Sequence, residues 1–203
     1  MKLYFSPGAC SLSPHIVLLE SGLPFECEQV DLKQKTTANG ADFTSINPKG
    51  YVPALRLDGG LVLTEGPAIV QYVADLAPEK RLAPLAGSLG RYRLAEWLNF
   101  ISTEIHKSYG PLFKPDASDE MKQAARAQLA RRLPTVAAAL DGNDYLMGEQ
   151  YSVADAYLFT VLNWAPKVGV DLSPWPALQR FQARVGARPA VQQAMRDEGL
   201  LAA

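Results

Sequence analysis

The sequence has little cysteine, almost no net charge and no long apolar run. Only two of its 203 residues are cysteine, Cys10 and Cys27, which excludes a disulfide framework and indicates a reducing, cytoplasmic setting. No apolar run approaches the roughly 20 residues that cross a bilayer, and the first residues lack the apolar stretch of a cleaved signal peptide. A formal net charge of -1 gives no reason to expect nucleic acid or a membrane surface as partner.

The first 78 residues alternate short apolar runs with helical stretches. Strands are predicted over 2–5 and 25–30, with a helix over 11–21 between them, and such a βαβ unit pairs its strands in parallel. The runs 54–57 and 61–63 flank Asp58-Gly59-Gly60, which predicts a hairpin. A helix follows over 65–76. Its predicted buried face consists of Ala68, Ile69, Tyr72, Val73 and Leu76.

The pattern changes after residue 78. Residues 79–87 have little periodicity and are interpreted as a linker. No further strand is predicted, and helices are expected over 88–109, 118–140, 152–164, 174–186 and 189–198. The sequence therefore predicts an α/β domain over 1–78 and an all-helical domain over 88–203.

Cys10 is the first candidate for chemistry. It lies in the turn Pro7-Gly8-Ala9-Cys10-Ser11, directly before the first predicted helix. Because a helix N-terminus offers free N–H groups and the positive end of a dipole, we expect a lowered pKa for the Cys10 thiol. The alternative is a small buried residue in a tight turn. Cys27, inside a predicted strand, is interpreted as a residue of the core.

Two neighbouring segments are candidates for binding. A cis Val52-Pro53 bond would turn the chain sharply and present the N–H and C=O of Val52 to a peptide ligand. Thr64-Glu65-Gly66-Pro67 opens the next helix, whose N-terminus suits a carboxylate while Glu65 suits an ammonium group. Together these features fit the charged groups of an amino acid; ordinary helix capping is the alternative.

A polar stripe marks the first helix of the second half. Asn99, Thr103 and His106 fall at i, i+4 and i+7, beside an apolar face. A solvated face is the ordinary explanation, but His106 is one of only two histidines and is a candidate for function. His15, inside the first predicted helix, is interpreted as structural.

These features occur together and in order in one family. Over essentially all 203 residues the chain resembles the cytosolic glutathione transferases, and specifically their bacterial beta class. The segments that carry the resemblance are Lys2–Tyr4, Ser6–Ser11, Asn47–Leu55, Thr64–Ile69, Trp97–Ile101 and Ser152–Phe159.

The resemblance implies a thioredoxin-like N-terminal domain of order βαβαββα with a cis-Pro53, an all-α C-terminal domain and a homodimer. It implies that the protein joins the thiolate of glutathione, its co-substrate, to small hydrophobic electrophiles. No other cofactor and no metal are expected.

The resemblance also implies roles for individual residues. Catalysis would rest on Cys10 assisted by His106, with Ser11 as a fallback donor and Tyr4 near the position where other classes keep a catalytic tyrosine. The implied glutathione contacts are Ala9, Cys10, Leu32, Lys35, Tyr51, Val52, Pro53, Glu65, Gly66, Asn99, Thr103, Glu104 and His106.

Within that set, Val52 would pair with the cysteinyl backbone, and Glu65 and Gly66 would hold the γ-glutamyl end. Leu32 and Lys35 match positions that line the glycyl end, and Glu104 would reach the glutathione of the other subunit. Two positions depart from the pattern: Tyr51 replaces an amide found in some relatives, and Gly66 replaces a serine.

Two alternatives stay open on the same fold. The first is a glutathione-dependent thiol-disulfide reductase that uses Cys10 as its nucleophile, for which the lack of a Cys-x-x-Cys pair permits only a one-cysteine mechanism. The second is a non-catalytic binding module. The sequence does not identify the electrophile.

Overall fold

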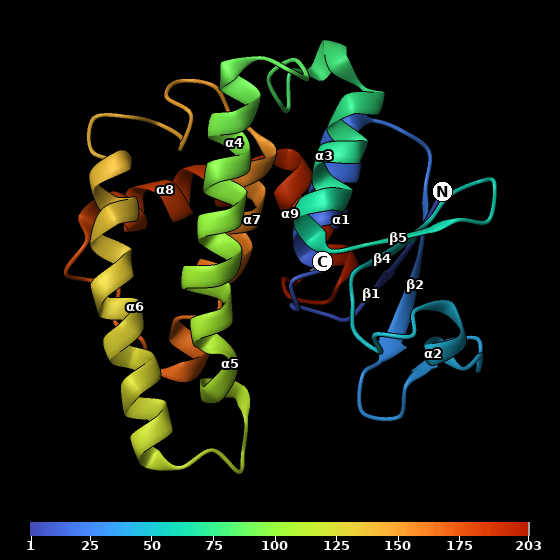
Figure 1. Cartoon of the computed structure of the whole chain (residues 1–203), viewed down its shortest axis with the longest axis horizontal. Helices are drawn as coiled ribbons and strands as arrows, with labels where there is room; N and C mark the ends of the chain where they lie inside the picture. Colours follow the sequence, from blue (N-terminus) through green and yellow to red (C-terminus); the bar gives the residue numbers. More distant parts are fainter. Residues whose placement is uncertain (203) are drawn as a thin grey trace.

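The computed structural model describes residues 1–202, so residue 203, the last of the predicted helical domain, lies outside the described residues. The first half is a sheet with its two longer helices on one side and a short helix on the other (Figure 1). Its elements are β1 (Lys2–Phe5), α1 (Leu12–Ser21), β2 (Glu26–Asp31), β3 (Thr36–Thr37), α2 (Phe43–Ile46), β4 (Ala54–Arg56), β5 (Val62–Thr64) and α3 (Gly66–Leu76).

The five strands form one sheet in the order β3-β2-β1-β4-β5. β1 pairs in parallel with β2, and β4 pairs antiparallel with both β1 and β5, so the predicted βαβ unit and hairpin are both confirmed. The sequence missed β3, because a strand of two residues is too short to show a periodicity. Helix α1 ends where predicted, at Gly22, whose φ of 70° is a left-handed conformation that favours glycine.

Helix α3 buries a face that differs from the predicted one. Its buried residues are Ile69, Val70, Val73 and Ala74, whereas Ala68 is exposed and Leu76 is 45% exposed. The prediction was wrong in part because α3 packs against both α1 and α7, and these two neighbours set which face is covered. As a result Leu76 lies at the surface.

The second half, residues 78–202, consists of helices joined by loops and contains no strand. A 3₁₀ turn at Pro78–Lys80 lies between the two halves. The further elements are α4 (Leu89–Phe100), a π-helical segment (Ile101–His106), α5 (Lys107–Phe113), α6 (Asp119–Ala139), α7 (Val153–Leu162), a 3₁₀ turn (Pro166–Val168), α8 (Pro176–Gly186) and α9 (Pro189–Asp197). The single helix predicted over 88–109 is thus interrupted by a wider π turn.

A shared core joins the two halves. α1 packs against α3 on one side and against α7 and α9 on the other, and all ten residues of α7 are buried. α7 begins at a capping box in which the Asp155 carboxylate accepts the N–H of Ser152 at 2.8 Å. Figure 1 shows α1 and α3 between the sheet and the helices α4 to α6. Within residues 1–202 we find no helix that is both long and apolar enough for a membrane span.

Candidate functional site

Two cavities meet at Cys10, between the sheet half and the helical half. The smaller, of about 320 Å³, has several polar side chains in its lining and lies between the Val52-Pro53 turn, the start of α3 and the π-helical segment. The larger, of about 760 Å³, is mainly apolar and lies between the Gly8 turn, α5 and the end of α7. Residues Cys10, His106 and Lys107 line both. A ligand sulfur near Cys10 would therefore face both cavities.

Cys10 holds its thiol against the opposite wall of the smaller cavity. Its S–H group donates to the Val52 carbonyl at 3.3 Å. The N–H groups of Cys10 and Ser11 favour the thiolate, as the helix-terminus argument predicts, but burial outweighs them and raises the pKa of Cys10 to about 12. The expectation of a lowered pKa was wrong, because it considered the helix end and ignored the desolvation of the cleft. Cys10 is a neutral thiol at physiological pH.

The Val52-Pro53 bond is cis, as predicted. Val52 is buried and lies outside the sheet, because β4 starts only at Ala54. Within residues 1–202 the Val52 N–H donates no hydrogen bond, and its C=O accepts only the weak S–H donor of Cys10. This peptide unit thus offers one free donor and one replaceable acceptor to the smaller cavity.

Glu65 lies at the start of α3 in a conformation that is rare for a residue with a side chain, with φ 69°. Its carboxylate accepts the Tyr51 hydroxyl at 2.8 Å and pairs with the Lys49 ammonium at 2.5 Å. These two donors lower the pKa of Glu65. Strained residues often cluster at binding sites, and here the turn directs a carboxylate into the cavity beside Gly66.

His106 projects from the π-helical segment into both cavities. Its Nδ1 lies 2.6 Å from the hydroxyl of Tyr157 on α7, and its ring meets Trp164 edge-on at 4.8 Å. Burial, reinforced by the charge of Lys107, lowers the pKa of His106 to about 4. The imidazole is therefore neutral at physiological pH, and with Tyr157 as the donor its Nε2–H is free to donate into the cleft.

Three residues of the site were not found in the sequence. Lys49 anchors Glu65, Ser102 lines the smaller cavity, and Tyr157 orients His106. Tyr157 carried a signal, since a hydroxyl on a largely apolar buried helix needs a partner. Ser102 carried none, because the π turn shifts which side chains face the cleft.

Several of the predicted residues lie outside the two cavities. Asn99 and Thr103 are exposed and bonded to each other, with the Thr103 hydroxyl donating to the Asn99 carbonyl at 3.1 Å. Glu104 forms an ion pair with Arg132 at 2.6 Å within the same subunit. Lys35 donates to the Gly50 carbonyl at 2.7 Å. Their roles toward glutathione stay predictions.

Ser11 and Tyr4 are held inside the sheet half. The Ser11 hydroxyl accepts the Ser6 N–H at 3.1 Å and donates to the Ser6 carbonyl at 3.3 Å, so it closes the turn and lies outside the lining of both cavities. Tyr4 is buried against Phe43, with centroids 5.8 Å apart. Ala9 and Leu32 do line the apolar cavity. Among residues 1–202 no three metal-ligating side chains lie together.

The fold and this cleft define a class of protein: a thioredoxin-like domain whose cis-proline turn faces an all-helical domain. The family models for the N-terminal and C-terminal domains of glutathione S-transferase match residues 8–76 and 100–189. The chain belongs to the glutathione S-transferase family.

Relatives and solved structures agree with this assignment along the whole chain. Glutathione S-transferase GstA of Escherichia coli O157:H7 is 48% identical, over 98% of this chain and 100% of its own. The ternary complex of BphK, a bacterial glutathione transferase, is 63% identical with a TM-score of 0.98, covering 98% of this chain and 100% of its own. The beta-class enzyme of Sphingomonas chungbukensis is 46% identical with a TM-score of 0.96, covering 99% and 100%. The resemblance to the bacterial beta class is confirmed.

Proposed function

We propose that this protein is a glutathione transferase that conjugates the glutathione thiolate to small hydrophobic electrophiles. The observation that carries the proposal is the free peptide unit of Val52, which lies beside Glu65 and Gly66 on one side and the Cys10 turn on the other. A γ-glutamyl tripeptide has the matching groups in the matching order. The names of the relatives support the same activity.

Binding would begin at the γ-glutamyl end of the tripeptide. The γ-glutamyl ammonium would pair with Glu65, and its carboxylate would lie at the Gly66 N–H, at the N-terminus of α3. The cysteinyl N–H of glutathione would donate to the Val52 carbonyl, and the cysteinyl carbonyl would accept the Val52 N–H, as in strand addition. This exchange releases the Cys10 S–H from Val52.

The released thiol would then act as a donor and not as a nucleophile. A thiol of high pKa is a poor nucleophile, but it can donate to the glutathione sulfur and stabilise it as a thiolate. The nearby N–H groups of Cys10 and Ser11 point to the same region, and the neutral His106 Nε2–H would add a further donor. The apolar cavity would hold the electrophile beside this sulfur, so that attack becomes effectively intramolecular.

The proposal includes a homodimer in the cytoplasm. Leu89 and Tyr92 of α4 are 74% and 66% exposed, and Leu76 of α3 lies near them because Arg91 of α4 pairs with Asp75 of α3 at 3.0 Å. Exposed apolar side chains gathered on one face are typical of an interface. Both cysteines are free, as a reducing compartment requires.

Glutathione titration and conjugation kinetics test the proposal. We expect calorimetric binding of glutathione and conjugation of 1-chloro-2,4-dinitrobenzene above the uncatalysed rate. Cys10→Ala should retain conjugation, with the alkaline-rising limb of its pH–rate profile moved to higher pH because one donor to the thiolate is lost.

Complete loss of activity in Cys10→Ala, together with a Cys10–glutathione disulfide trapped during turnover, would support the reductase instead. Binding of glutathione without turnover of any electrophile would support the binding module. Failure to bind glutathione at all would overturn the proposal.

A further inference from the structure

We propose that the electrophile of this enzyme carries an anionic group, such as an aryl carboxylate, held by lysines at the rim of the apolar cavity. The inference rests on the proposed function and specifies its substrate class. It begins from the composition of the cavity lining. Three lysines, Lys107, Lys114 and Lys167, line the cavity, and no carboxylate does.

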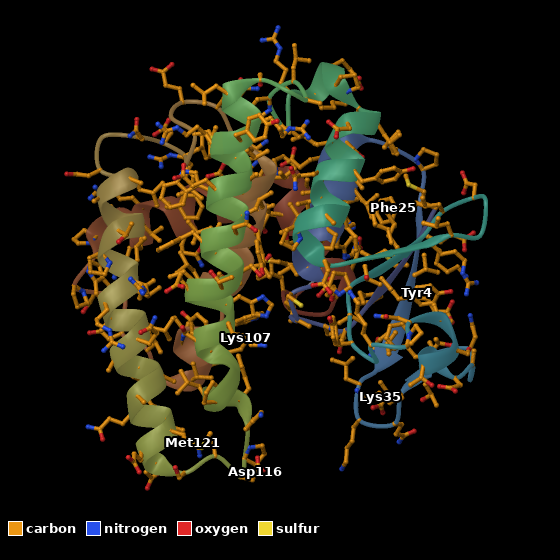
Figure 2. All side chains as sticks on the ribbon, in the orientation of Figure 1. Tyr4, Phe25, Lys35, Lys107, Asp116 and Met121 are labelled. Carbon is orange, nitrogen blue, oxygen red and sulfur yellow. The ribbon has the colours of Figure 1, made fainter. Side chains whose placement is uncertain are left out.

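The three ammonium groups surround the cavity from different elements. Lys107 begins α5, Lys114 follows its last residue, and Lys167 lies in the 3₁₀ turn after α7. The Lys167 Nζ lies close to Gly8, only 3.1 Å from where a Cβ would stand there, next to the Cys10 turn. Figure 2 shows Lys107 on the helical half, across the cleft from Lys35 on the sheet half. The cations thus lie around the space where the electrophile must sit.

None of these lysines is neutralised within residues 1–202. No carboxylate lies within 4.0 Å of any of them. The chain as a whole has 20 basic and 21 acidic side chains, so a lack of acidic residues does not explain this. Two acidic groups near Cys10 have other partners: Glu65 pairs with Lys49, and Glu198 contacts Gly8 and His15. Unpaired cations around a low-dielectric cavity raise the local concentration of anions.

The apolar part of the lining fits an aromatic body. Phe113 and Trp164 meet edge-on at 5.5 Å, and Met121 completes this wall. An aryl halide with a carboxylate could place its ring there and its charge at the lysines. In the reaction, the glutathione sulfur forms a bond to the ring carbon, the carbon–halogen bond breaks with its electron pair going to halide, and the thiol proton passes to solvent.

A matched pair of electrophiles tests the inference: 4-chloro-3,5-dinitrobenzoate and its neutral amide. We expect the wild-type protein to give a higher kcat/KM for the carboxylate, and raised ionic strength to reduce the preference. The double substitution Lys114→Gln with Lys167→Gln should reduce the carboxylate-to-amide ratio about five- to tenfold, since an exposed ion pair contributes a factor of about two to five.

A control variant with the same change of charge is Lys80→Gln with Arg180→Gln, which lie outside the cavity lining. Its ratio should equal that of the wild type. An unchanged ratio in the lysine variant, or an equal fall in the control, would overturn the inference while conjugation of the amide still supports the transferase. Failure of the wild type to conjugate either compound would instead contradict the proposed function.

Discussion

Gly66 lies at the site but has no side chain to offer a ligand. It lies in the first turn of α3 and lines the smaller cavity, where its backbone N–H is the only donor that it can offer. A Cβ at this position would meet only the Pro53 ring, at an ordinary contact distance of 3.8 Å, and the backbone is helical. The position therefore accepts a side chain without strain.

We expect Gly66→Ser to lower the KM for glutathione about fivefold with little change in kcat. The added hydroxyl can donate to the γ-glutamyl carboxylate, and a hydrogen bond to a charged group contributes about 1.5–3 kcal/mol before the cost of ordering. Initial-rate kinetics at saturating electrophile measure the effect. Gly66→Ala adds the Cβ without the hydroxyl; equal KM values for the two variants would show that the hydroxyl makes no contact.

At the scale of residues, the sequence predicted which side chains lie at the site better than it predicted their ionisation states. Cys10, Val52 and Glu65 were found because turn and helix-end motifs place them, and such motifs are local. His106 was found because it is one of only two histidines and lies on a polar stripe of a predicted helix. The pKa of Cys10 was predicted in the wrong direction because it depends on the walls that the other half of the molecule contributes. Burial of this kind is a property of the assembled cleft.

At the scale of elements, the turn before α1 is held from both sides. Gly8 has a φ of 69°, which favours glycine, and its N–H donates to the Glu198 carboxylate at 2.8 Å. Its carbonyl accepts the indole N–H of Trp164, also at 2.8 Å. The second oxygen of Glu198 meets Nδ1 of His15 at 3.0 Å. The end of the chain and the end of α7 thus position the peptide two residues before Cys10.

Glu198→Ala should therefore reduce both stability and activity. It removes the acceptor of the part-buried Gly8 N–H and the partner of the buried His15 ring, and breaking such a contact on one side costs about 3 kcal/mol. Urea unfolding and kcat/KM measure the two effects. The neighbouring Asp197, 42% exposed and 3.7 Å from His15, provides the control: Asp197→Ala should cost less than about 1 kcal/mol. Similar losses in both variants would contradict the positioning role.

The π-helical segment explains why the polar stripe of Asn99, Thr103 and His106 does not line one cavity. The stripe assumes an α-helical period, and the wider turn over Ile101–His106 changes which residues share a face. Ser102, His106 and Lys107 then line the smaller cavity. Helix positions were predictable from periodicity and caps, but this local change of period has no composition signal.

At the scale of the whole molecule, the cleft exists because two differently built halves share one core. α1 contributes to both, since it lies against α3 and also against α7 and α9. The fold class followed from the order of strand and helix patterns, which is a long-range regularity of the sequence. The misplaced face of α3 has a different origin, because a helix between several neighbours has no single polar side to reveal its orientation.

The exposed apolar face of α3 and α4 makes the dimer testable. Leu89→Glu with Tyr92→Glu would place carboxylates in the proposed interface, where an unpaired buried charge is strongly unfavourable. Light scattering after size exclusion should give the mass of one chain for this variant and twice that mass for the wild type, with unchanged far-ultraviolet circular dichroism. Met121→Glu replaces another exposed apolar residue, 51% exposed at the cavity, and should leave the mass at two chains. A dimeric Leu89→Glu/Tyr92→Glu protein would place the interface on another face.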